Sequence, residues 1–145
     1  MLDLARLTIL VVEDDPDARE LMQAVLEQRG ATVVSAESVA RAFEQLETAR
    51  PDVIISDIAM PEEDGYVLIK KIRARGARKS GDIPAAALTA YAKIEDRVSI
   101  LAAGFQMYLS KPADPSELIA VVASLASSRR RPLDIVPKVS ESPDD

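Results

Sequence analysis

Polar side chains that could take part in a reaction or bind a metal follow four of the apolar stretches in this sequence. In chain order they are Glu13-Asp14-Asp15, Asp57, Thr89 and Ser110-Lys111. Carboxylates that gather in one place repel one another unless a cation compensates them, and a lysine supplies only one positive charge. A ligand set of oxygens without histidine or cysteine favours Mg²⁺. Together with a lysine and a hydroxyl, such a set suits a transferring phosphoryl group, which a carboxylate can accept as an acyl phosphate.

The composition removes several other kinds of chemistry. The 145 residues include no cysteine and no histidine. Disulfide scaffolds, thiol nucleophiles, Ser-His-Asp hydrolysis and a phosphohistidine within the chain are therefore excluded. A net charge of −6 argues against nucleic-acid binding by the domain as a whole. No apolar run approaches the about 18–20 residues that cross a bilayer, and no signal peptide begins the sequence, so we expect no membrane insertion and a cytoplasmic protein.

Short apolar stretches alternate with amphipathic ones five times along the chain. The predicted strands are Leu7–Val12, Thr32–Ala36, Val53–Ile55, Ile83–Leu88 and Phe105–Leu109. Apolar residues at helical spacing follow each strand, and the fourth such group is Ile94, Val98, Leu101 and Ala102. Asp15-Pro16 and the Asp114–Glu117 capping box predict where the first and fifth helices begin.

Five strand–helix units imply a parallel sheet with helices on both faces and right-handed crossovers. In such sheets ligands bind beyond the carboxyl ends of the strands, where the polar residues fall in this sequence. Residues 1–127 are predicted to form one domain. After Leu125 the composition becomes polar and proline-rich, so residues 128–145 are predicted to be a disordered tail.

The sequence resembles the receiver domain of two-component response regulators over roughly residues 7–127. The motifs that carry the resemblance are Val11–Asp15, Ile55–Pro61, Asp64-Gly65, Leu88–Tyr91 and Tyr108–Pro112. Any one of them is a weak signal, whereas five in order, each at the end of a predicted strand, are specific. The resemblance implies a flavodoxin-like, doubly wound (βα)5 α/β fold whose five-stranded parallel sheet has the order 2-1-3-4-5.

The resemblance also implies roles for individual residues. Asp57 would be the phosphoacceptor. Asp14, Asp57 and the backbone carbonyl of Ala59 would ligate Mg²⁺ directly, while Glu13 would act mainly through metal-bound water. The acidic pair is often Asp-Asp in this family, so Glu13 is a departure from the common pattern.

Three further residues would respond to the phosphoryl group. Lys111 would contact a phosphoryl oxygen, and its peptide bond to Pro112 would be cis. Thr89 would hydrogen-bond the phosphoryl group and move toward it. Tyr108 would be the switch aromatic that turns inward as Thr89 moves.

The function implied is a switch that catalyses only its own phosphorylation and dephosphorylation, and is otherwise not an enzyme. A histidine kinase or a histidine phosphotransfer protein would be the phosphodonor. A downstream protein would bind the fourth helix, the fifth strand and the fifth helix of a monomer or a phosphorylation-dependent dimer. The segment Gly104–Tyr108 lacks the acidic pair found at the dimer face of one large DNA-binding subfamily. It looks more like receivers of hybrid histidine kinases, or single-domain receivers like the chemotaxis regulator.

Two other classes of function compete with this hypothesis. One is a receiver-like binding module that does not use phosphate, which loss of the acidic pair, Asp57 or Lys111 would support. The other is a small enzyme on a similar fold. A flavodoxin would need a phosphate-binding loop in place of the acidic Glu13–Asp15. A dehalogenase-like phosphatase would need its Asp-x-Asp nucleophile there, and Asp15-x-Asp17 matches only in spacing.

Overall fold

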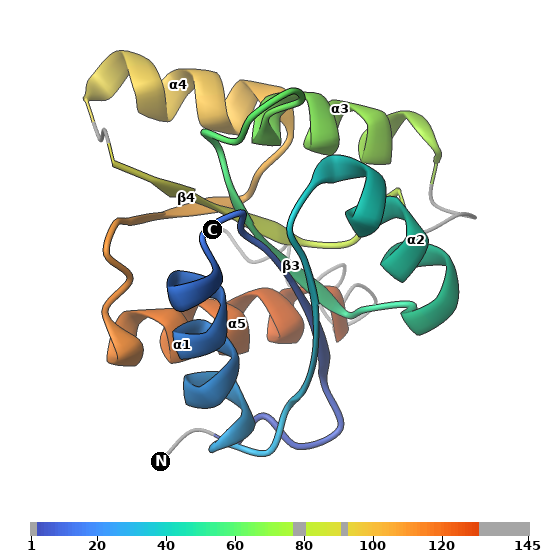
Figure 1. The fold of residues 1–145 in the computed structure, drawn as a ribbon, viewed down its shortest axis with the longest axis vertical. Coiled ribbons are helices and arrows are strands. Elements are labelled where there is room, and N and C mark those ends of the chain that lie inside the picture. Colours follow the sequence, from blue (N-terminus) through green and yellow to red (C-terminus); the bar gives the residue numbers. More distant parts are fainter. Residues whose placement is uncertain (1–2, 77–80, 91–92, 131–145) are drawn as a thin grey trace, which may run out of the picture.

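A computed structural model describes residues 3–76, 81–90 and 93–130, in which five strands alternate with five helices (Figure 1). The strands are β1 (Thr8–Val12), β2 (Thr32–Ala36), β3 (Val53–Asp57), β4 (Ala85–Thr89) and β5 (Met107–Ser110). The helices are α1 (Pro16–Glu27), α2 (Val39–Ala49), α3 (Gly65–Ala74), α4 (Ile94–Ala103) and α5 (Pro115–Arg130). Every predicted element is present, and the fourth and fifth strands begin two residues later than predicted.

The five strands form one parallel sheet with the order β2-β1-β3-β4-β5, which confirms the expected topology. Val12 pairs with Ser56, and Asp57 pairs with Leu88 on the next strand. This register brings the carboxyl ends of the strands to one edge of the sheet. All five residues of β3 and of β4 are buried, as expected for parallel strands covered on both faces.

Helices cover both faces of the sheet. α1 and α5 pack on one face, whereas α2, α3 and α4 pack on the other (Figure 1). Successive strand residues alternate between these two layers. On β3, for example, Ile55 belongs to the α1–α5 core and Ile54 to the α2–α4 core. If this alternation continues just past a strand end, a residue two positions beyond a given strand residue points into the same layer.

Local hydrogen bonds fix where the helices begin. Asp15 caps α1 by accepting a hydrogen bond from the backbone N–H of Asp17 at 3.1 Å. Asp114 accepts one from the N–H of Glu117 at 3.0 Å, at the start of α5. Both predicted caps are confirmed. Capping of this kind satisfies backbone donors that have no partner within the helix.

Gly65 starts α3 directly against the end of β3. A Cβ atom at this position would lie 2.4 Å from the carbonyl oxygen of Asp57 and 2.9 Å from the Cα of Ile58. No side chain fits there without moving backbone. The glycine thus allows α3 to approach the strand end that carries Asp57.

The fourth helix differs from the prediction in how it faces the sheet. Ile94, Val98 and Leu101 are 73%, 62% and 50% exposed, and among the helix residues only Ile100 is classed as buried. The i, i+4, i+7 spacing does define one face of the helix. That face points to solvent, because periodicity identifies an apolar face without identifying what the face contacts.

The C-terminal helix is longer than expected. α5 continues to Arg130, three residues past the predicted domain boundary at residue 127. The remainder of the predicted tail, residues 131–145, lies outside the described residues. Among the residues that are described, no helix has both the length and the apolar character that crossing a bilayer requires.

Candidate functional site

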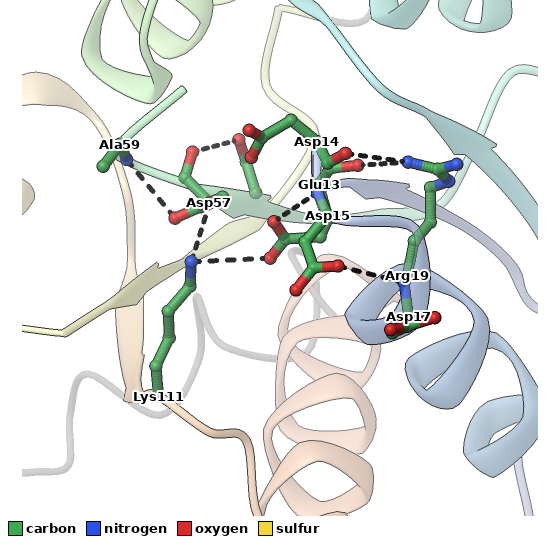
Figure 2. A network of polar contacts seen from close by, with 9 residues as sticks. Glu13, Asp14, Asp15, Asp17, Arg19, Asp57, Ala59 and Lys111 are labelled. Carbon is green, nitrogen blue, oxygen red and sulfur yellow. Dashed lines mark hydrogen bonds and ion pairs between the residues drawn. The ribbon is translucent and has the colours of Figure 1, made fainter. Parts of the chain in front are cut away.

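Three strands deliver charged side chains to one rim of the sheet. Glu13 follows β1, Asp57 ends β3 and Lys111 follows β5. In each case the strand residue two positions earlier packs in the α1–α5 core. By alternation the three charged side chains lie on that same side of the sheet, where Figure 2 shows them converging. The sequence-based prediction that these residues meet is confirmed.

Asp57 is held between a lysine and a backbone amide. Lys111 Nζ donates a hydrogen bond to Asp57 Oδ2 at 2.7 Å, and the N–H of Ala59 donates to Oδ1 at 3.3 Å. The carboxylate residue is only 1% exposed. Charge-assisted hydrogen bonds of this kind orient a buried carboxylate. The peptide bond between Lys111 and Pro112 is cis, as the resemblance implied.

Glu13 is buried with one oxygen unsatisfied. Its Oε2 accepts a hydrogen bond from the N–H of Asp15 at 3.1 Å. Its Oε1 has no hydrogen-bond partner among the described residues and lies 3.6 Å from Lys111 Nζ. Burial raises the pKa of Glu13 from 4.5 to about 7, with a smaller contribution from the charge of Asp57. A buried carboxylate oxygen that accepts no hydrogen bond is unfavourable, and a cation bound beside it would stabilise its charge.

The three carboxylates form a group that fits a divalent cation. Glu13, Asp14 and Asp57 each present an oxygen, and these oxygens lie within 4.8 Å of one another. One ammonium cannot neutralise three carboxylates, and all the donors are oxygens. This donor set, together with a Glu13 Oε1 that accepts no hydrogen bond among the described residues, fits Mg²⁺. The backbone of Ala59 lies at the same place, while the role of its carbonyl stays a prediction.

Lys111 remains charged inside this group. Burial lowers its pKa, but the hydrogen bond to Asp57 and the negative charges of Glu13 and Asp57 outweigh burial and raise it overall. An ammonium that is positively charged throughout the physiological range is therefore fixed beside Asp57. It is available to attract an anionic group that approaches the carboxylate.

Thr89 and Tyr108 lie on the other face of the sheet. Tyr108 packs against the α2–α4 core, and its register partner on β4 is Ala87 in the same core. Thr89 is two residues beyond Ala87, so alternation places it on that face too. The guanidinium of Arg97 on α4 lies over the Tyr108 ring, 5.6 Å from its centroid. The site thus straddles the sheet edge, with acidic and basic groups on one side and the two predicted switch residues on the other.

An apolar cavity adjoins the charged cluster on the side of α1. Its volume is about 280 Å³, and Ala18, Leu21, Met22 and Ala113 line it beside Glu13 and Lys111. Leu21, an apolar residue of α1, is 59% exposed. Helical spacing gave no sign that these residues border the site. Their role appears only when the loop between β5 and α5 is placed beside α1.

Glu13→Gln is expected to stabilise the metal-free protein by roughly 1–3 kcal/mol at high pH. Because the folded state binds the Glu13 proton more tightly than the unfolded state, the parent loses stability as pH rises from 4.5 to about 7. Glutamine carries no charge, so the variant's advantage should develop through that same window. Urea denaturation with chelator at about pH 5 and about pH 8 measures it.

Exposed Glu20 on α1 provides the matched control, since Glu20→Gln changes the net charge equally without entering the cluster. Added Mg²⁺ should stabilise the parent more than Glu13→Gln. A variant that is less stable than the parent at the higher pH would show that burial of this carboxylate is not unfavourable.

Comparison with known proteins adds a family and several relatives. The family model that matches is the response regulator receiver domain, over residues 9–123. An uncharacterised 14.6 kDa protein from Leptolyngbya boryana is 48% identical over 122 residues, which cover 84% of this chain and 92% of that protein. Response regulator Rre1 from Synechocystis is 36% identical over 129 residues, 88% of this chain but only 55% of the longer relative.

A solved structure supports the fold as well. The signal receiver domain of a signal transduction histidine kinase from Syntrophus aciditrophicus superposes with a TM-score of 0.76 at 33% sequence identity. The match covers 86% of this chain and 93% of that one. The fold therefore agrees with that of an experimentally solved receiver domain.

Proposed function

The chain belongs to the response regulator receiver domain family, and we propose that Asp57 is the residue on which it accepts a phosphoryl group. The observation that carries the proposal is the environment of this carboxylate. Asp57 is buried, hydrogen-bonded to Lys111 at 2.7 Å, and grouped with Glu13 and Asp14, whose oxygens lie within 4.8 Å of one another and of Asp57. Receiver domains are signalling modules, and we infer that this one catalyses only its own phosphorylation and dephosphorylation.

The reaction follows from the groups at the rim. An oxygen of Asp57 attacks the phosphorus of a phosphohistidine, an O–P bond forms, and the N–P bond to the imidazole breaks. Lys111 attracts the phosphoryl oxygens as they approach. Asp14, Asp57 and the Ala59 carbonyl would hold Mg²⁺ directly, and Glu13 would hold it mainly through water. The ion would supply the positive charge that lets an anion approach three carboxylates. The sequence contains no histidine, so the phosphohistidine belongs to a histidine kinase or a phosphotransfer protein.

The response would cross the sheet edge. A phosphoryl group on Asp57 gives the Thr89 hydroxyl a new acceptor, and movement of Thr89 leaves room for Tyr108 to turn inward. Such a modification biases an equilibrium between two existing arrangements and creates no new fold. The location of Thr89 on β4 and Tyr108 on β5, beneath α4, supports a readout centred on α4 and β5 and not on α1.

The exposed apolar residues of α4 support a protein partner at this readout. Ile94, Val98 and Leu101 line one solvent-facing stripe. Receiver domains interact with histidine kinases and downstream effectors. We place the downstream protein on α4, β5 and α5, with the chain as a monomer or a phosphorylation-dependent dimer. We expect this exchange to take place in the cytoplasm without direct contact to nucleic acid.

Beryllofluoride, which mimics an aspartyl phosphate, provides the test. NMR spectra of the full chain with Mg²⁺ should change on its addition at the amides of Asp57, Ala59 and Thr89, and also along α4 and β5. The changes should need Mg²⁺ and should be absent with fluoride alone. If beryllofluoride with Mg²⁺ leaves the Asp57 and Ala59 amides unchanged, the proposed function is wrong.

A further inference from the structure

Arg19 on α1 reaches back to the loop that carries two of the carboxylates. Its Nη1 donates a hydrogen bond to the backbone carbonyl of Glu13 at 2.8 Å, and a longer one to that of Asp14 at 3.5 Å. Its own backbone N–H donates to the carbonyl of Asp15 at 3.0 Å. Figure 2 shows the guanidinium beside the loop, on the side away from Asp57. The Arg19 side chain thus holds the carbonyls of Glu13 and Asp14, while its backbone N–H makes an ordinary helical hydrogen bond at the start of α1.

The other contacts of this loop restrict it further. The N–H of Glu13 donates to the carbonyl of Ala36 at 3.0 Å, which continues the pairing of β1 with β2. The Asp15 side chain caps α1, and its N–H is bonded to Glu13 Oε2. Because the Asp15 N–H shares a peptide plane with the Asp14 carbonyl, its hydrogen bond to Glu13 Oε2 already restrains that plane. The preceding peptide plane carries the Glu13 carbonyl, to which Arg19 donates the shorter of its two side-chain hydrogen bonds. Arg19 is the residue that binds both of those carbonyls.

We propose that Arg19 is a positioning residue for the divalent-cation site. By holding the Glu13 and Asp14 carbonyls on one side of the loop, it keeps both carboxylates on the other side, facing Asp57. The cation then binds a site whose ligands are already in place, and little conformational entropy is lost on binding. This inference rests on the proposed function, since it assumes that the acidic group binds a cation.

Whether Mg²⁺ binding becomes weaker or stronger when Arg19 is replaced distinguishes a positioning role from simple charge repulsion. Arg19 is a cation near a cation site, so removing its charge should strengthen Mg²⁺ binding if Coulomb repulsion dominates. Loss of positioning should do the opposite. Removing residues that orient metal ligands typically weakens affinity by about 10–100-fold. Because Arg19 contacts backbone and not the carboxylates, we expect the lower end, about 10-fold.

Isothermal titration of the full chain with Mg²⁺ measures this effect. Arg19→Met, which retains an apolar stem of similar length, should raise the Kd for Mg²⁺ about 10-fold. Both hydrogen bonds come from a single nitrogen, so Arg19→Lys should recover part of the affinity. Arg41→Met is the matched control and should leave Kd unchanged. This exposed arginine lies on α2, and its guanidinium pairs with Glu44, away from the acidic loop.

The possible outcomes distinguish the role of Arg19 from the proposed phosphoryl-accepting function. If the parent chain does not bind Mg²⁺, the proposed function and this inference both fail. If the parent binds and Arg19→Met binds equally or more tightly, only the role of Arg19 is overturned, even if the variant unfolds at a lower temperature. Should Arg19→Met not fold, Arg19→Gln, too short to reach both carbonyls, is used with the same expectations.

Discussion

Asp57→Asn is expected to abolish formation of the aspartyl phosphate, lowering its rate by on the order of 10³-fold or more. The amide that replaces the carboxylate is a poor nucleophile. Among the residues that the structure describes, Asp57 is the one bonded both to Lys111 Nζ and to the Ala59 N–H. The fold should survive, because an amide oxygen can still accept the hydrogen bond from Lys111. Phosphoprotein-retarding gels after incubation with Mg²⁺ and acetyl phosphate, or with a phosphorylated histidine kinase, measure the product.

Asp17→Asn is the control for this experiment. Asp17 is an exposed carboxylate in the first turn of α1, close to the rim but without a contact to Asp57 among those described. The Asp17→Asn variant should be phosphorylated to the same extent as the parent. Labelling of Asp57→Asn at the parental level would identify a different acceptor, with Asp14 the first to examine.

Lys111→Met is expected to separate catalysis from metal binding. Phosphorylation should fall by about 10²-fold, because the group that attracts the phosphoryl oxygens is gone. The affinity for Mg²⁺ should stay equal or rise, because a cation that competes for the Glu13 and Asp57 oxygens has been removed. Gel assays of phosphorylation and titration calorimetry with Mg²⁺ give the two values on the same protein.

The same variant tests the ion pair as a contribution to stability. Without Mg²⁺, removal of Lys111 leaves buried carboxylates uncompensated, and we expect a loss of roughly 1–3 kcal/mol, reduced from a fully buried pair because Lys111 is 31% exposed. Adding Asp57→Asn should restore part of that loss. Lys71→Met removes an exposed pair with Glu63 and should change the free energy of unfolding by less than about 0.5 kcal/mol. Equal losses for Lys111→Met and Lys71→Met would contradict the importance of the buried pair.

The elements of the fold could be predicted because their signals are local. Asp15-Pro16 and Asp114–Glu117 mark helix starts through hydrogen bonds to residues two or three positions away, and both caps are present. The fourth helix shows where local signals fail. Ile94, Val98 and Leu101 were correctly assigned to one helical face, but whether that face meets the sheet or solvent depends on how α4 packs against α3 and β5.

The members of the acidic site could also be predicted, and their arrangement could not. A parallel sheet gathers the ends of its strands at one edge, so Glu13, Asp57 and Lys111 were expected together. Glu13 Oε1 accepts no hydrogen bond among the described residues because Lys111 Nζ lies 3.6 Å from it but 2.7 Å from Asp57 Oδ2. The sequence does not indicate these distances. Arg19 gave no signal in sequence, because an arginine in an amphipathic helix is ordinarily a solvent-exposed residue.

By itself, the sequence determined which residue types reach the rim of the sheet, since strand ends, helix caps and the absence of histidine are properties of short segments or of composition. Only the tertiary structure decided how these residues meet. Lys111 and Asp57 are 54 positions apart, and their contact depends on the register of strands joined by two crossovers. The division of the site between the two faces of the sheet, with Arg19 behind the acidic loop, likewise follows from packing that no short segment encodes.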